Sequence, residues 1–177
     1  MAKLVALLRA VNVGGRKLPM AELSALCEGL GWSEIRTYIQ SGNLVFEADA
    51  APAALEAQLE KALSARFGFE VPVVIRTSPQ WKALVASNPF AKESETEANW
   101  VLAGLSKAKL DPGAAAAIQA KAASGERVVQ AGEALWFHYP AGVGTSKLTP
   151  ALIDRAAGSA VTARNWRTII MLNEMLN

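Results

Sequence analysis

The sequence predicts an α+β protein built from two similar halves. Apolar runs of strand length alternate with segments whose apolar residues recur at helical spacing, and glycine and proline mark the boundaries. The order strand, helix, strand, strand, helix, strand occurs twice. The chain has 177 residues, of which 51% are apolar and 19% charged, so it is predicted to be globular, with one sizeable domain or two small ones.

The first half supports this order by its spacing. Lys3–Val11 is an apolar run of strand length that Gly14 and Gly15 break. Pro19 suits the first turn of the following helix, and Pro72 marks the last strand as an edge strand because proline has no N–H to donate. In chain order the predicted elements are a strand at 3–11, a helix at 19–30, a hairpin of strands at 35–40 and 43–47, a helix from about 50 to 67 and a strand at 71–76.

The second half repeats the element order without clear residue identity to the first. A linking helix begins at Ser78 and Pro79. The elements that follow are a strand at 100–105, a helix at 111–123, a hairpin of strands at 127–130 and 135–139, a helix at 149–158, a strand at 161–163 and a C-terminal helix capped by Asn165. The predicted domains are a first half at 1–77, a linking helix and loop at 78–98 and a second half at 99–177. Each half has the split βαβ, ferredoxin-like pattern, so we expect two ferredoxin-like halves in one compact protein.

Composition excludes several classes of function. The net charge of +2 is too small to demand nucleic acid, although it permits an anionic ligand. The single cysteine, Cys27, excludes an internal disulfide and lies in an apolar helical stripe, so we expect a core role and a cytoplasmic protein. Arg9 ends the apolar N-terminal run too early for a secretory signal, and no apolar window is long enough to span a membrane. One cysteine and one histidine build no usual metal cluster, and no cofactor is predicted.

Two polar loops are predicted to meet at one edge of the first sheet. A right-handed crossover makes the first two strands parallel, and the third strand lies between them, antiparallel to both. The loop Asn12–Gly15 and the hairpin tip Gln40–Asn43 should therefore lie close together. The glycines let the backbone turn sharply and bring N–H groups close to a guest, while Arg9, Arg16 and Lys17 add positive charge. The N-terminus of the next helix also favours an anion. The residues on which this site would rest in this half are Arg9, Asn12, Gly14, Gly15, Lys17, Gln40, Ser41, Gly42 and Asn43.

A structural interpretation stands beside the functional one. A glycine pair after a strand is a common turn, and glycine and asparagine both tolerate the positive φ that tight turns require. A hairpin needs only two turn residues, however, and this tip offers four small polar ones. On the spacing alone, a turn is the more common explanation.

The second half carries three further candidate groups. The loop 139–150 contains Ser146 and Lys147 before a helix, but its glycine spacing fits neither a P-loop nor a serine elbow, so an anion-binding loop and an ordinary connection are equally good interpretations. Arg164 and Asn165 lie in the stretch 162–168, where a guanidinium could hold a phosphate or the asparagine could simply cap a helix. His138, the only histidine, lies on the same strand face as Trp136 and is more often structural there than a general base.

Five short stretches together resemble a known family. They are LLRAVNVGGRKLPMAEL, TYIQSGNLVF, NPF, GVGTSKL and TARNWRT, and in this order they are similar to the bacterial domain-of-unknown-function family 1697 (DUF1697) over about residues 4–172. The commoner family form has glycine where this chain has Ala10. The resemblance implies two ferredoxin-like halves and no assigned reaction, cofactor or substrate. It also raises the expectation that the matching polar residues share a site.

The leading hypothesis is a protein that binds a small anionic ligand, phosphate-bearing or nucleotide-like, at the two loops. Ser146, Lys147, Arg164 and Asn165 of the second half are included as candidate ligand-binding residues. A second hypothesis is an enzyme that acts on such a ligand through Lys147, Ser146 or His138. A third is a structural or interaction protein whose motif residues only build turns. RNA binding is a minor alternative, because the first half lacks the basic and aromatic motif of RNA-binding sheets. The sequence leaves the oligomeric state open.

Overall fold

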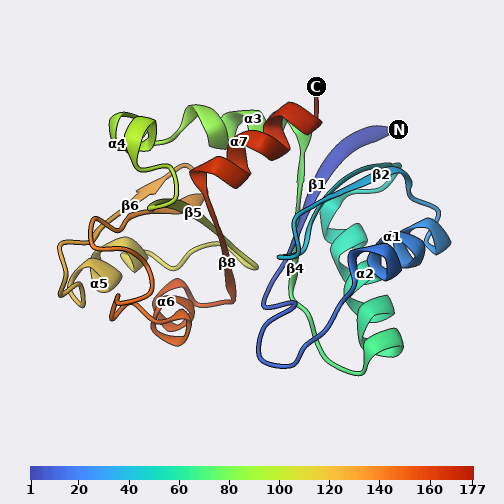
Figure 1. Ribbon diagram of the computed structural model, residues 1–177, viewed down its shortest axis with the longest axis horizontal. Helices are drawn as coiled ribbons and strands as arrows, with labels where there is room; N and C mark the ends of the chain where they lie inside the picture. Colours follow the sequence, from blue (N-terminus) through green and yellow to red (C-terminus); the bar gives the residue numbers. More distant parts are fainter. The chain divides into compact units, whose positions relative to one another are not determined.

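The computed structural model describes residues 1–177 and confirms an α+β protein with two four-stranded antiparallel sheets and seven helices (Figure 1). The chain forms two compact units, and each is described by itself. The first consists of Met1–Lys82 with Leu172–Asn177, and the second of Ala83–Met171. The boundary therefore runs inside the helix α3 (Ser78–Ala86), and the helix α7 (Trp166–Met175) ends in the first unit.

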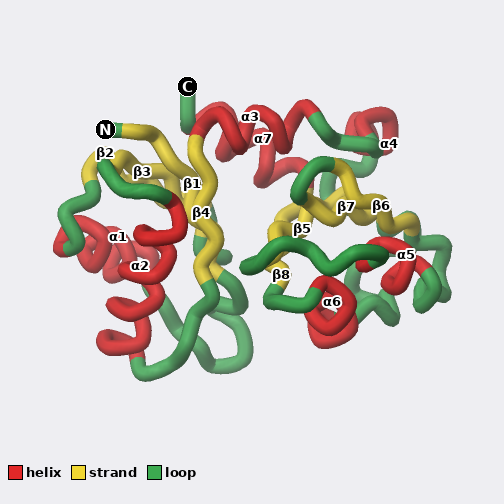
Figure 2. Tube along the Cα trace, turned by 180° about the vertical axis from the view of Figure 1, so that it is seen from behind, coloured by secondary structure: helices red, strands yellow, loops and turns green.

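The first unit has the predicted order of elements. Its sheet runs β2-β3-β1-β4 with every neighbouring pair antiparallel, and both helices cover one face of it (Figures 1 and 2). The elements are β1 (Ala2–Leu8), α1 (Met20–Gly29), β2 (Ser33–Tyr38), β3 (Asn43–Ala48), α2 (Pro52–Phe67) and β4 (Val73–Thr77). Pro19 takes the N-cap position of α1 and not its first turn.

The core of this unit lies between the sheet and its two helices. Leu4 and Leu8 of β1 pack there with Leu59 of α2, and all three are almost completely buried. The ring of Trp32 stacks on Phe46 with 4.1 Å between the ring centroids. Val5 and Leu7, on the other face of β1, are buried as well, so this strand is buried on both faces.

Side chains close the outer edge of β4. The backbone N–H groups of Val73 and Ile75 donate to the carboxylates of Glu60 and Glu56, at 3.0 and 2.8 Å, and both glutamates come from α2. The next outward N–H, that of Thr77, donates to the Oε1 of Gln80 at 2.8 Å. The edge position predicted from Pro72 is confirmed, and three successive edge donors are satisfied within the unit.

The second unit repeats this topology, with strand order β6-β7-β5-β8 and antiparallel pairs throughout. Its elements are α4 (Ala91–Thr96), β5 (Val101–Ser106), α5 (Ala114–Gln119), β6 (Arg127–Ala131), β7 (Ala134–His138), α6 (Pro150–Ala157) and β8 (Val161–Asn165). The helices α5 and α6 lie on one side of this sheet (Figure 2). Their apolar residues form a core cluster with Leu135 and Phe137. No helix of the chain is both long and apolar enough to cross a membrane.

Two elements of this unit differ from the prediction. The helix α5 ends at Gln119, not at 123. The Gln119 side chain binds the edge of β6: its amide donates to the Glu126 carbonyl and accepts from the Val128 N–H. The short helix α4 was not predicted, because its sequence has no apolar stripe. It is held instead by Ser94, which is buried and donates to the Phe90 carbonyl at 2.8 Å.

Candidate functional site

The two polar loops of the first unit lie side by side, as the topology predicts. The Asn12 side-chain amide donates to the Gln40 carbonyl at 2.5 Å, and the Leu8 N–H donates to the Gly42 carbonyl at 2.8 Å. We call the segments Arg9–Leu18 and Ile39–Asn43 together the loop pair. Gly42 has a φ of +82°, and a Cβ built there would lie 2.7 Å from the Cγ2 of Val11, so only glycine fits this approach.

Two asparagine side chains build the loops themselves. Asn12 donates to the Leu18 carbonyl at 3.0 Å and accepts from the Leu18 N–H at 2.9 Å, which closes the first loop. Asn43 is completely buried and donates to the Tyr38 carbonyl and to the Ser41 hydroxyl, at 3.0 and 2.9 Å. These contacts explain part of the polar character of the hairpin tip and of the first loop, because both asparagine amides fix the turns.

The first loop also presents backbone donors that the chain does not use. The N–H groups of Val13, Gly14 and Gly15 have no acceptor within the protein, and all three residues are exposed. Gly14 and Gly15 have φ values of +56° and +82°. Successive N–H groups in turns of this kind form concave sites for anions. Lys17 is exposed beside them, and the loop pair contains no carboxylate.

The two arginines of the first loop have different surroundings. Arg16 donates to the Glu70 carbonyl at 3.2 Å, and its guanidinium lies 5.4 Å from the centre of the Phe69 ring, so it braces the loop against the segment before β4. Arg9 is half-buried, and its backbone N–H donates to the Pro72 carbonyl at 3.0 Å. Of the three cations of the loop pair, Lys17 is the exposed one, and Arg9 and Arg16 are half-buried.

Ser146 of the second unit holds a buried carboxylate. Its hydroxyl donates to Glu126 at 2.7 Å and accepts from the Leu148 N–H at 3.1 Å, while the Ser124 N–H donates to the other carboxylate oxygen at 2.6 Å. The hydrogen bond from Ser146 holds the pKa of Glu126 below its usual value. A carboxylate with a lowered pKa is a poor general base, so this pair anchors the loop 139–150 and does not resemble an activated nucleophile. The neighbouring Lys147 is exposed.

Two other candidates of the second unit have structural contacts. Asn165 caps α7 by accepting from the Thr168 N–H at 3.0 Å, as predicted. Arg164 donates to the Ala163 carbonyl at 2.9 Å, and burial lowers the pKa of its guanidinium to about 10, which leaves it charged at neutral pH. The structure thus gathers Arg9, Asn12, Gly14, Gly15, Lys17, Gln40, Ser41, Gly42 and Asn43 in the first unit, whereas Ser146, Lys147, Arg164 and Asn165 belong to the second.

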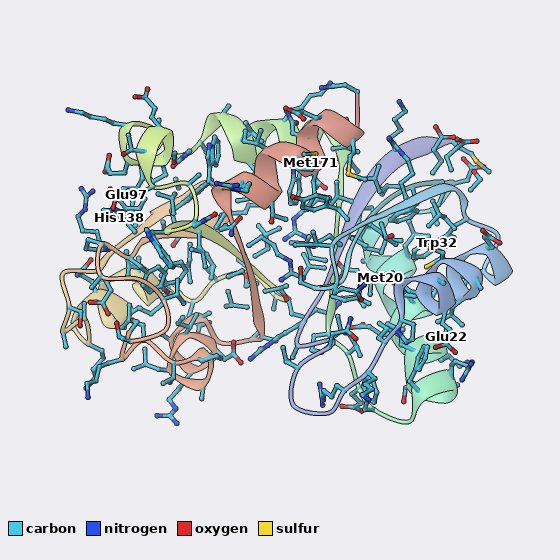
Figure 3. All side chains as sticks on the ribbon, viewed as in Figure 1. Met20, Glu22, Trp32, Glu97, His138 and Met171 are labelled. Atoms are coloured by element: carbon cyan, nitrogen blue, oxygen red, sulfur yellow. The ribbon has the colours of Figure 1, made fainter.

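His138 lies in a polar cluster that the sequence did not reveal. Its Nε2 is 3.4 Å from a carboxylate oxygen of Glu97 (Figure 3), and its Nδ1 faces the Arg127 guanidinium at 3.3 Å. Arg127 also pairs with Glu93, and this contact lowers the pKa of the Glu93 carboxyl. With Arg127 donating to it, Nδ1 acts as the acceptor and Nε2 carries the hydrogen. His138 is 6% exposed, so the cluster pins α4 to the hairpin and offers no accessible base. Glu93 lies on α4, the helix that was not predicted, and Glu97 is the C-cap residue of this helix.

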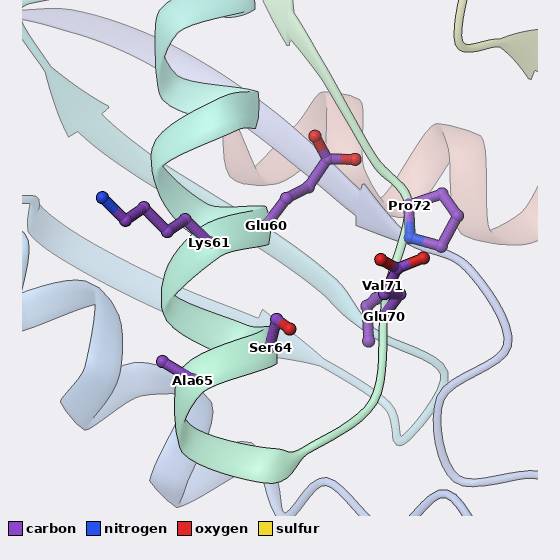
Figure 4. A pocket seen from close by; sticks show the side chains of 7 residues that line it. All are labelled: Glu60, Lys61, Ser64, Ala65, Glu70, Val71 and Pro72. Atoms are coloured by element: carbon purple, nitrogen blue, oxygen red, sulfur yellow. The ribbon is translucent and has the colours of Figure 1, made fainter.

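A cavity of about 630 Å³ lies between α2 and the segment before β4. Its lining residues are Glu60, Lys61, Ser64, Ala65, Glu70, Val71 and Pro72 (Figure 4). The Glu60 carboxylate points toward β4, where it accepts from the Val73 N–H and satisfies a donor of the sheet edge. No group of three or more His, Cys, Asp or Glu side chains is arranged to hold a metal ion. Cys27 is buried, which raises the pKa of its thiol to about 12 and leaves it unreactive at neutral pH.

Comparisons with known proteins identify the family and the fold. The family described as "Protein of unknown function (DUF1697)" matches residues 1–136. Among solved structures, the conserved bacterial protein SP0830 from Streptococcus pneumoniae is similar, with a TM-score of 0.73, 20% sequence identity and coverage of 99% of both chains. At this identity the likeness concerns the fold alone. No curated protein sequence matches the chain.

Proposed function

The chain belongs to the DUF1697 family, and we propose that it binds a small anionic ligand, phosphate-bearing or nucleotide-like, at the loop pair of the first unit. The observation that carries this proposal is the set of three successive unused N–H groups at Val13, Gly14 and Gly15 beside the exposed Lys17. Backbone donors of this kind hold phosphate oxygens at close range, and the lysine adds a long-range attraction.

The charge of the loop pair favours the same ligand. Arg9, Arg16 and Lys17 fall within ten residues, and neither loop has a carboxylate that would repel an anion. Asn12 and Asn43 fix the backbone in this arrangement before any ligand arrives, so little conformational entropy would be lost on binding. In this proposal the two asparagines position the site, and the contacts to the ligand come from the backbone and Lys17.

The other hypotheses have weaker support. An enzyme acting through Ser146 or His138 would need these side chains to be accessible and activated, and both are engaged in the contacts described above. Lys147 is exposed, and none of the contacts described above gives it a partner that would lower the pKa of its amine. We further propose that each unit is ferredoxin-like, which the strand order β4-β1-β3-β2 and its repeat in the second unit support. A cytoplasmic location is proposed from the single, buried, reduced cysteine.

A thermal-unfolding experiment tests the proposed binding. A ligand that binds only the native state raises the unfolding midpoint, and at one hundred times its dissociation constant it stabilises the protein by about 2.7 kcal/mol. We expect pyrophosphate and ADP to raise the midpoint of the wild-type protein. In ¹H–¹⁵N spectra, the amide signals of Val13, Gly14 and Gly15 should shift most on titration with pyrophosphate.

Two charge reversals provide the matched comparison. Lys17→Glu should abolish the rise in midpoint, whereas Lys82→Glu, at an exposed lysine of the same unit, changes the net charge equally and should preserve it. If neither anion affects the wild-type protein, or if the two variants respond alike, the loop pair is not an anion site and the motif residues only build turns.

A further inference from the structure

Two exposed aliphatic side chains stand on the loop pair. Val13 is 57% exposed and Ile39 is 53% exposed, more than any other large hydrophobic residue except Met1. Val13 directly follows Asn12, and Ile39 directly precedes Gln40. Since the Asn12 amide binds the Gln40 carbonyl, the two apolar residues flank the point where the loops touch. Val13 carries one of the unused N–H groups, and Ile39 belongs to the loop that the Asn12–Gln40 contact holds against it.

The backbone at Ile39 is unusual for its residue type. Its φ is +49°, in the left-handed region that β-branched residues rarely adopt. Asparagine or glycine would adopt this conformation with less strain. With 53% of its surface exposed, the Ile39 side chain gains little packing in exchange, so the stability of the fold does not explain an isoleucine at this position.

From these observations we infer that the ligand of the loop pair is an organic phosphate whose apolar part, of the nucleoside type, lies against Val13 and Ile39. This inference rests on the proposed function, because the N–H groups of Val13–Gly15 and Lys17 hold the phosphate. Ile39 and Val13 add the contact that distinguishes an ester with a large apolar group from a bare phosphate. Burial of apolar surface supplies the affinity difference.

Two diphosphate esters of equal charge separate the phosphate contact from the apolar contact. We expect ADP to bind the wild-type protein about tenfold more tightly than methyl diphosphate, which corresponds to the burial of one or two methylene equivalents. Ile39→Asn should remove this preference by weakening ADP about tenfold, and it should leave the affinity for methyl diphosphate within about twofold. Lys17→Glu should weaken both ligands.

The variants are chosen so that loss of folding does not imitate the result. Asparagine accepts a positive φ, so Ile39→Asn should unfold no more easily than the wild type. Val143→Asn makes a similar aliphatic-to-asparagine change at a residue that is 39% exposed in the second unit, and it should preserve the preference for ADP.

The possible results distinguish failure of the proposed function from failure of this inference. If neither ester binds the wild-type protein, the proposed function fails. If both bind equally, or if Ile39→Asn leaves the preference intact, the anion site stands and this inference is overturned. If the esters bind equally and Ile39→Asn abolishes sedimentation with phosphatidylserine vesicles, Ile39 contacts a membrane surface and the inference is equally wrong.

Discussion

The corresponding loops of the two units differ although the strand order is the same. In the second unit β6 and β7 remain paired up to Ala131 and Ala134, so only two residues form the turn. In the first unit the last pair is Tyr38 with Asn43, and four residues lie between them. The repeated topology therefore needs only a two-residue turn. The longer polar tip of the first unit is an addition that the fold does not require.

The loops after the first strand of each unit show the same contrast. In the second unit this loop is tied to the end of α6 and to the connection before β8: Lys107 and Asp111 donate their backbone N–H groups to the carbonyls of Ala160 and Ala157, at 2.8 and 3.0 Å. It also carries the Asp111 carboxylate. In the first unit three successive N–H groups stay without acceptors and no carboxylate is present. In our proposal the anion site therefore occupies only one of two topologically equivalent loops.

The largest expected loss of stability tests the difference in packing between the two hairpin turns. Gly42→Ala should destabilise the protein by about 3 kcal/mol, because the new Cβ would meet Val11 and Leu8 at 2.7 and 2.8 Å and the φ is +82°. Gly132→Ala in the short turn has a φ of +60° but no atom within 4 Å, so it should cost only about 1 kcal/mol. Urea unfolding measures both variants. Equal losses would mean that the close approach of the first loop to its hairpin is not essential.

The second prediction concerns the buried carboxylate of the second unit. Ser146→Ala removes the hydrogen bond that lowers the pKa of Glu126, and we expect a loss of about 1–2 kcal/mol at neutral pH. A carboxyl group whose pKa is lowered in the folded state stabilises the protein at pH values above its unfolded-state pKa of about 4.5. This contribution is lost as the pH falls through the lower folded-state pKa. The variant should therefore lose less stability on acidification than the wild type does.

The same variant separates the structural and the binding motifs. Because Ser146 is an anchor and not a ligand contact in our proposal, Ser146→Ala should bind pyrophosphate as the wild type does. Denaturant titrations between pH 3 and 7 give the stability, and the midpoint shift with pyrophosphate gives the binding. A variant that keeps its stability and loses the midpoint shift would instead assign the loop 139–150 to the ligand site.

The third prediction compares the edge strands β4 and β8. Three outward N–H groups of β4 donate to side-chain acceptors. In β8, the N–H of Val161 donates to the Asp154 carboxylate at 2.9 Å. Glu60→Ala should cost about 1 kcal/mol and expose one donor of the β4 edge. Lys61→Ala, at the exposed neighbour on α2, is the control and should leave the free energy of unfolding within about 0.5 kcal/mol of the wild type. Equal stability of the two variants would show that water replaces the Glu60 carboxylate at no cost.

The sequence predicted the features that depend on local pattern. The strand length of the first apolar run, the edge position of the strand after Pro72 and the Asn165 cap are all confirmed. The convergence of the two loops also followed from topology. The sequence did not predict contacts that depend on tertiary placement: Glu56 and Glu60 on the β4 edge, Ser146 on Glu126 and the pairing of α4 with His138. The spacing of polar residues in the chain carries no information about which distant N–H or carboxylate they meet.

The smallest expected effect concerns the residue that departs from the commoner family form. Ala10 has a φ of +57°, which favours glycine, so Ala10→Gly should stabilise the protein by up to about 1 kcal/mol despite the greater flexibility of glycine in the unfolded chain. The matched control is Ala108→Gly in the corresponding loop of the second unit, where φ is not positive and glycine should destabilise by about 0.5–1 kcal/mol. Opposite signs in urea unfolding would confirm that the first loop holds a strained backbone that its counterpart lacks. A loss of stability in both variants would mean that Ala10 adopts an ordinary conformation in solution, and the difference between the two loops would then lie in their hydrogen bonds alone.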